Sequence, residues 1–154
     1  MEIIETNSPL FRLDSATLGP VGVKLSYIHT ATGRAYLAAC GDAERDSIID
    51  RLRPANPGEG SEAELRQMLQ LVRQRGYATR DPMLPWPDRS KQLVLRDGRR
   101  SMAVPIVVAG TPIATINVTW PGRRGADETV VQRHLDALKA TARAIAVALH
   151  ASPC

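Results

Sequence analysis

The chain has 154 residues, of which 44% are hydrophobic and 23% charged, so it can form one globular domain with a buried core. These hydrophobic and charged fractions are typical of globular proteins and exclude a chain that is disordered throughout. No apolar run approaches the roughly 18 residues that a membrane-spanning helix needs, and the first ten residues lack the basic-then-apolar order of a secretory signal. These features predict a cytoplasmic protein. Two cysteines, Cys40 and Cys154, are too few for a disulfide framework or a metal site.

The net charge is +4, and only three of the 20 basic residues are lysines. A basic chain suggests a nucleic-acid partner, but a DNA-binding surface usually needs a cluster of basic side chains. Here they form only short pairs, Arg99–Arg100 and Arg123–Arg124, and are otherwise mixed with acidic residues. The sequence therefore disfavours direct contact between this segment and nucleic acid.

The N-terminal part of the chain predicts short strands and then a helix. The alternation of apolar and polar residues in Phe11–Asp14 indicates extended structure within residues 3–18. Either Thr30 or Thr32 can cap the helix that follows, which runs through an alanine-rich stretch. Gly33, near the start of this helix, indicates close approach of another backbone segment.

Two more helices and a loop are expected next. The second helix covers residues 42–52, and Ser61 begins a third one through a capping box with Glu64. Gly76 ends this third helix at the position where glycine most often follows a helix. Residues 80–90 combine three prolines with apolar side chains, which predicts a loop that folds back over the domain.

The C-terminal part of the chain predicts a β-hairpin and a long helix. The strands cover residues 101–108 and 113–120, with a connecting loop of about four residues. Pro105 favours an edge position or a bulge, because proline cannot donate a hydrogen bond to a neighbouring strand. A helix starts near Asp127, and the following residues form its apolar stripe: Val131, Leu135, Leu138, Ala142, Ile145 and Leu149. Adjacent antiparallel strands with helices packed on them give an α+β domain.

Few residues indicate catalysis or metal binding. His29, His134 and His150 have no partner at metal-ligand spacing, so solvated or capping histidines are expected. Cys40 lies among alanines without a nearby basic partner, which favours a buried structural thiol. The sequence contains no nucleophile elbow, P-loop or dinucleotide-binding motif, and it predicts neither an enzyme nor a cofactor.

A polar face on the second hairpin strand is the best candidate for a site. Thr115, Asn117 and Thr119 alternate with apolar residues, so they share one face of the strand. Alternation alone favours a solvent-facing surface, as is common in antiparallel sheets. The other interpretation is the floor of a pocket, where small hydroxyl and amide groups orient a polar ligand.

Five segments in this order resemble the C-terminal effector-binding domain of IclR-type transcriptional regulators. They are Thr30–Leu37 (TATGRAYL), Arg73–Ala78 (RQRGYA), Ser101–Ile106 (SMAVPI), Ala114–Val118 (ATINV) and the closing amphipathic helix. The resemblance runs from about Ile3 to Leu149. The TGRAYL motif and the Trp-containing insert within residues 80–90 look most similar to the branch that activates catabolism of hydroxyphenylpropionate and related aromatic acids.

The resemblance implies a GAF-like sensor fold that binds a small organic or aromatic acid and assembles into homodimers or tetramers. Residues 1–154 would form one effector-binding domain that lacks its first strand. The N-terminal winged helix-turn-helix, which contacts DNA in such regulators, would be absent from this chain. The alternative is a stand-alone GAF-like ligand-binding module that never contacts DNA.

The resemblance also places the residues of the ligand pocket. These are Ala31 and Thr32 at the start of the first helix, Ser101 on the first hairpin strand, and Asn117 with Thr119 on the second. Where the family has an acidic residue after its Gly-Tyr motif, this chain has Arg80, next to Asp81. An inward Arg80 could hold a ligand carboxylate with a bidentate fork, although arginines are mostly exposed, which favours a solvated side chain.

Overall fold

The computed structural model describes residues 25–52, 61–80, 99–122 and 127–151. In chain order they form helices α3 (Ala31–Ala39), α4 (Asp42–Leu52) and α5 (Glu62–Arg75), strands β1 (Ala78–Thr79), β2 (Arg99–Val108) and β3 (Thr111–Pro121), and helix α6 (Asp127–Ala151). The expected strands within residues 3–18 and the expected loop after Arg80 lie outside the described residues. None of the described helices is both long and apolar enough to cross a membrane.

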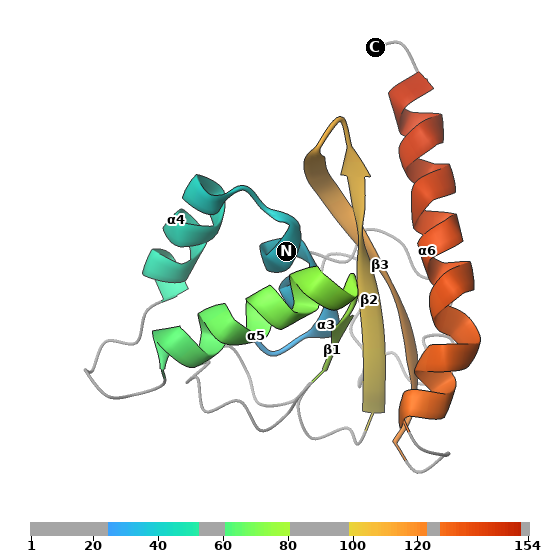
Figure 1. Ribbon diagram of the computed structural model, residues 1–154, viewed down its shortest axis with the longest axis horizontal. Coiled ribbons are helices and arrows are strands. Elements are labelled where there is room, and N and C mark those ends of the chain that lie inside the picture. Colours follow the sequence, from blue (N-terminus) through green and yellow to red (C-terminus); the bar gives the residue numbers. More distant parts are fainter. Residues whose placement is uncertain (1–24, 53–60, 81–98, 123–126, 152–154) are drawn as a thin grey trace.

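The three strands form an antiparallel sheet in the order β1-β2-β3. Helices α3, α4 and α5 lie on one side of this sheet, and α6 runs along the other side (Figure 1). The α+β prediction is therefore confirmed. Strand β1 was not expected from the sequence, because two residues are too short for a visible alternation.

Local signals set the ends of the helices. Thr30, rather than Thr32, caps α3, and its side chain accepts a hydrogen bond from the backbone N–H of Gly33. Ser61 caps α5 and accepts from the N–H of Glu64, as the capping-box pattern predicted. Gly76 ends α5 in the left-handed conformation, with φ of 76°.

The hairpin differs from the prediction at its turn. Strand pairing continues to Val108 and Thr111, so the connection contains only two residues, and the prediction of about four was wrong. These residues, Ala109 and Gly110, have φ of 49° and 81°, as in the turns whose twist matches the twist of the strands. A register shift follows Pro105, between Ile106 and Val107, while β1 pairs with β2 only at Met102 and Ala103.

The sheet face toward α6 is apolar. Its core contains Met102, Val104 and Ile106 of β2, Trp120 of β3, and Val131, Leu138 and Ala142 of α6. The predicted stripe of α6 is therefore confirmed over most of its length. Leu149 is the exception: it is 48% exposed and does not belong to this core.

The opposite sheet face contacts α3. A second core joins buried residues of α3, α4 and α5 to Ala78 of β1 and Ala103 of β2. Because Ala103 lies directly opposite Asn117, this is the face that carries the polar residues of β3.

Candidate functional site

The N-terminal end of α3 is organised around Thr30. The Oγ1 atom of Thr30 donates to the carbonyl oxygen of Ser26 at 2.6 Å and accepts from the backbone N–H of Gly33 at 3.0 Å. The Thr32 hydroxyl donates to the Thr30 Oγ1 at 3.0 Å. Ala31 and Thr32 are buried, and within the described part of the chain no acceptor is seen for their two N–H groups, which open the helix. Such groups suit an anionic or carbonyl oxygen.

Gly33 lets the preceding loop pack against this helix end. A Cβ atom at Gly33 would lie 2.6 Å from the carbonyl carbon of Tyr27, and closer still to the carbonyl oxygen of Ser26. The expected close backbone approach is confirmed. The same loop is held by the Ser26 side chain, whose Oγ accepts from the N–H groups of Ile28 and His29 at 3.2 Å.

The polar side chains of the hairpin face α3 as a group. Ser101 pairs with Thr119, and Ala103 pairs with Asn117, so the four residues share a face. The Asn117 Nδ2 group donates to the Thr119 Oγ1 at 3.1 Å. Ser101 is buried, whereas Asn117 and Thr119 are exposed. Helix α3 packs on both β2 and β3, while the exposure of Asn117 and Thr119 agrees with the solvent-facing surface that alternation alone favours.

Arg80 extends the same row of residues. Its backbone N–H donates to the carbonyl oxygen of Ser101 at 3.0 Å, and its Nη1 donates to that of Arg99 at 3.4 Å. The residue is only 8% exposed, so the expectation of a solvated loop arginine was wrong. The structure thus brings Arg80, Ser101 and Thr119 into neighbouring positions at one end of the sheet.

Arg34 is the buried polar residue that sequence reasoning missed. It is 2% exposed and lies in the first turns of α3. Its Nε donates to the carbonyl oxygen of Ile28 at 2.5 Å, and its Nη1 donates to that of Thr79 at 3.1 Å. The TGRAYL segment contains this residue, but nothing in its spacing shows that the side chain points inward.

His29 also differs from the prediction. It is 4% exposed, so it is neither solvated nor placed at the surface as a cap. His29 lies in the local turn before α3, where the Ser26 Oγ accepts from the backbone N–H groups of Ile28 and His29. His134 and His150 are exposed on α6, as expected.

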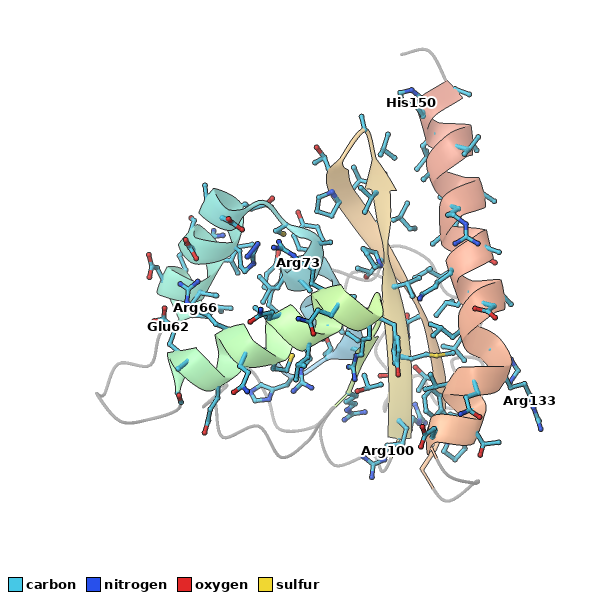
Figure 2. The ribbon with its side chains drawn as sticks, viewed as in Figure 1. Glu62, Arg66, Arg73, Arg100, Arg133 and His150 are labelled. Atoms are coloured by element: carbon cyan, nitrogen blue, oxygen red, sulfur yellow. The ribbon has the colours of Figure 1, made fainter. Side chains whose placement is uncertain are left out.

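The other end of α3 is closed by arginines. Arg45 donates to the carbonyl oxygens of Leu37 and Cys40. Arg73, labelled in Figure 2, donates to the carbonyl oxygens of Ala38 and Cys40. These bonds satisfy carbonyls that a helix leaves without intrahelical partners. The expectation that Cys40 has no nearby basic residue was wrong in this respect.

Cys40 itself is a buried thiol, as predicted. Burial, followed by the negative charge of Glu44, raises the pKa of the Cys40 thiol to about 11. Burial and the hydrogen bond to Glu44 also raise the pKa of Tyr36, whose hydroxyl donates to Oε1 at 2.8 Å. Because a neutral thiol is a weak nucleophile, Cys40 is a structural residue.

The described residues contain no group of three His, Cys, Asp or Glu side chains that could hold a metal ion. Acidic residues instead pair with arginines at the surface, as where Arg66 of α5 contacts both Glu62 and Asp46 (Figure 2). The candidate site is thus built from hydroxyl, amide, backbone N–H and guanidinium groups. Such groups can orient and bind a small polar ligand.

Solved structures with a similar fold are transcriptional regulators. A regulator from Rhodococcus sp. RHA1, RHA06195, is 28% identical with a TM-score of 0.66, over 85% of this chain and 50% of that one. The C-terminal domain of the E. coli transcriptional regulator KdgR is 24% identical with a TM-score of 0.65, over 84% and 74%. The inducer-binding domain of PobR from Acinetobacter, a double mutant in complex with 3-hydroxybenzoic acid, is 22% identical with a TM-score of 0.61, over 82% and 69%.

No curated protein sequence matches the chain. The chain spans about half the length of the Rhodococcus regulator and of the Agobacterium tumefaciens repressor BlcR, a structure 22% identical with a TM-score of 0.66. The family model described as "Bacterial transcriptional regulator IclR C-terminal" matches residues 10–147, which is most of the chain. This family consists of regulators rather than enzymes and has the α+β, GAF-like fold seen here. The chain therefore belongs to the IclR family of bacterial transcriptional regulators and corresponds to their C-terminal effector-binding domain.

Proposed function

We propose that this domain senses a small organic acid, held between the start of α3 and the polar face of the sheet. The site consists of the backbone N–H groups of Ala31 and Thr32 and the side chains of Arg80, Ser101, Asn117 and Thr119. The observation that carries this proposal is the shared face of Ser101, Thr119 and Asn117, with Arg80 buried beside them and α3 packed on the same face.

The donors favour an anionic ligand. Helix N–H groups and a guanidinium both stabilise a carboxylate, and charge-assisted hydrogen bonds are stronger than neutral ones. Arg80 is already buried, so a carboxylate would meet a guanidinium that has lost most of its contact with water. Ser101, Asn117 and Thr119 would bind the remaining polar groups of the ligand.

Aromatic acids are the first class of ligand to test. The sequence resembles the branch that responds to hydroxyphenylpropionate and related compounds, and the PobR inducer-binding domain with the same fold was solved with 3-hydroxybenzoic acid. Both observations support an acid of this size and chemistry for the present chain. Short-chain aliphatic acids form the comparison class.

We also propose that ligand binding modulates DNA binding by a separate winged-helix domain in a homodimer or tetramer. Residues 1–154 would supply the effector-binding domain. The Rhodococcus regulator and the repressor BlcR are each about twice as long as the region that matches this chain, which supports a second domain. An in-frame winged-helix segment upstream of the Met1 codon would agree with this arrangement, and a stop codon there would favour a stand-alone ligand-binding module.

The ligand proposal can be tested by thermal shift with the 154-residue chain. Wild-type protein is screened against benzoate, 3-hydroxybenzoate, 3-(4-hydroxyphenyl)propionate, acetate and pyruvate. A bound acid should raise Tm, and Ser101→Ala and Asn117→Ala should reduce that shift. Gln132→Ala, on the exposed surface of α6, is the matched control and should keep it. An unchanged shift in both pocket variants would exclude the assigned site.

A further inference from the structure

The buried Arg34 connects the two walls of the proposed pocket. We propose that Arg34 is a positioning residue, which fixes the start of α3 relative to the strand end that carries Arg80. This inference rests on the proposed function for the identity of the ligand, but its geometry involves only residues of this chain. Arg34 itself is not proposed to touch the effector.

The first contact of Arg34 holds the loop that leads into α3. Its Nε donates to the carbonyl oxygen of Ile28 at 2.5 Å. Ile28 lies between the Ser26–Tyr27 backbone, which packs against Gly33, and the cap residue Thr30. Any shift of Ile28 therefore moves the backbone N–H groups of the first helical turn, which are the proposed anion donors.

The second contact holds the other wall. The Nη1 of Arg34 donates at 3.1 Å to the carbonyl oxygen of Thr79, a residue 45 positions away along the chain. Thr79 pairs with Met102, and the next residue, Arg80, bonds to the carbonyl of Ser101. The register of Arg80 against the hairpin thus depends on the position that Arg34 gives to Thr79.

An arginine is needed for this role because both bonds use one planar group. The Nε and Nη1 atoms of a guanidinium point in fixed directions, so the two carbonyl oxygens are held at one separation. A lysine carries the same charge on a single nitrogen and cannot reproduce this fork. Charge alone should therefore not restore the geometry.

Arg73 offers a matched comparison at the opposite end of the same helix. Its Nε and Nη2 atoms also donate to two backbone carbonyls, those of Ala38 and Cys40. These carbonyls belong to the last turn of α3 and its cap, away from the proposed donors. Both arginines stabilise α3, but only Arg34 connects it to β1.

The test compares Arg34→Lys, Arg34→Met, Arg73→Lys and Arg73→Met in the 154-residue chain. Amide hydrogen exchange is followed for residues 26–33 and 78–80, and the affinity for 3-hydroxybenzoate or another acid that shifts the wild-type Tm is measured by calorimetry. Both Arg34 variants should lose protection in the two segments together and raise Kd about tenfold or more. Both Arg73 variants should lower Tm while leaving Kd and these two segments unchanged.

Two outcomes would overturn the proposal. In one, Arg34→Lys restores wild-type exchange and affinity, so that the charge and not the fork is required. In the other, the Arg34 and Arg73 variants lose affinity in proportion to their loss of Tm, as for any structural arginine. If no acid binds the wild-type chain, the ligand proposal fails, and the exchange of the two segments still decides whether Arg34 holds them together.

Discussion

The two faces of the hairpin carry different chemistry on the same strands. Toward α6, Met102 and Val104 of β2 meet Val118 and Ile116 of β3, and the α6 stripe packs on them. Toward α3, the positions between them carry Ser101, Ala103, Asn117 and Thr119. Successive side chains of a strand point to opposite faces of the sheet. Neighbouring residues of the hairpin therefore alternate between packing against α6 and facing the candidate binding site. Both faces contribute a buried core, and only the α3 face also carries small polar side chains among the described residues of the hairpin.

The largest expected effect comes from the apolar face. Leu138 of α6 is 6% exposed within this core, so Leu138→Ala should lower the free energy of unfolding by about 3 kcal/mol. Leu149→Ala is the control on the same helix, where 48% of the residue is exposed and the loss should stay below about 1 kcal/mol. Urea denaturation measures both. Equal losses would contradict the division of α6 into a packed part and an exposed end.

The second prediction concerns the α3 face. In Gly33→Ala, the new methyl group would meet the backbone of Ser26 and Tyr27, which cannot move away as a flexible side chain could. We expect a loss of about 2 kcal/mol. Gly41→Ala is the control, because an added Cβ there meets nothing within 4 Å. A Gly33→Ala variant as stable as the wild type would show that the loop and helix are not in close contact.

Neighbouring substitutions on β3 compare the faces directly. Val118→Asn places an amide in the α6 core and should cost roughly 1–2 kcal/mol. Asn117→Val, one residue away on the exposed polar face, should change stability by less than about 0.5 kcal/mol. The reverse ranking in thermal denaturation would mean that the faces are assigned the wrong way round.

A further effect, confined to alkaline pH, is a pH dependence from Cys40. Its pKa is about 11 in the folded chain, above the ordinary value of 9.0, so folding favours the neutral thiol. This contribution is complete below about pH 9 and is lost as pH rises toward 11. Wild-type protein should therefore lose more stability than Cys40→Ala between these pH values. If the wild type and Cys40→Ala give parallel curves of unfolding free energy against pH, Cys40 does not cause the loss of stability at high pH.

Local and periodic features of the fold could be predicted from the sequence. The cap at Ser61, the end at Gly76 and the long period of α6 each depend on neighbouring residues or on one repeating face, whereas the cap of α3 was narrowed only to Thr30 or Thr32. The hairpin was expected, but its turn was not, because a non-glycine residue such as Ala109 rarely adopts positive φ.

Long-range features could not be predicted. The burial of Arg34 and Arg80 depends on carbonyl oxygens that the fold brings from other segments, and no pattern around either residue records them. Strand β1 exists because β2 offers an edge to Ala78 and Thr79. The family resemblance indicated Arg80 and the row of Ser101, Asn117 and Thr119, and the shared face of these residues supports their assignment as a pocket that still has to be tested.

The basic composition of the chain has a use inside the fold. Six arginines donate to backbone carbonyl oxygens in the described residues: Arg34, Arg45, Arg51, Arg73, Arg75 and Arg80. Each guanidinium offers several fixed donors, and those of Arg45 and Arg73 bind carbonyl oxygens at the C-terminal end of α3. The isoelectric point near 9.5 thus partly reflects the arginines that hydrogen-bond the backbone of this fold. A chain with lysine in place of these arginines would migrate almost equally as a basic protein on an electrophoretic gel. It would lack the paired hydrogen bonds from one guanidinium to two backbone carbonyls.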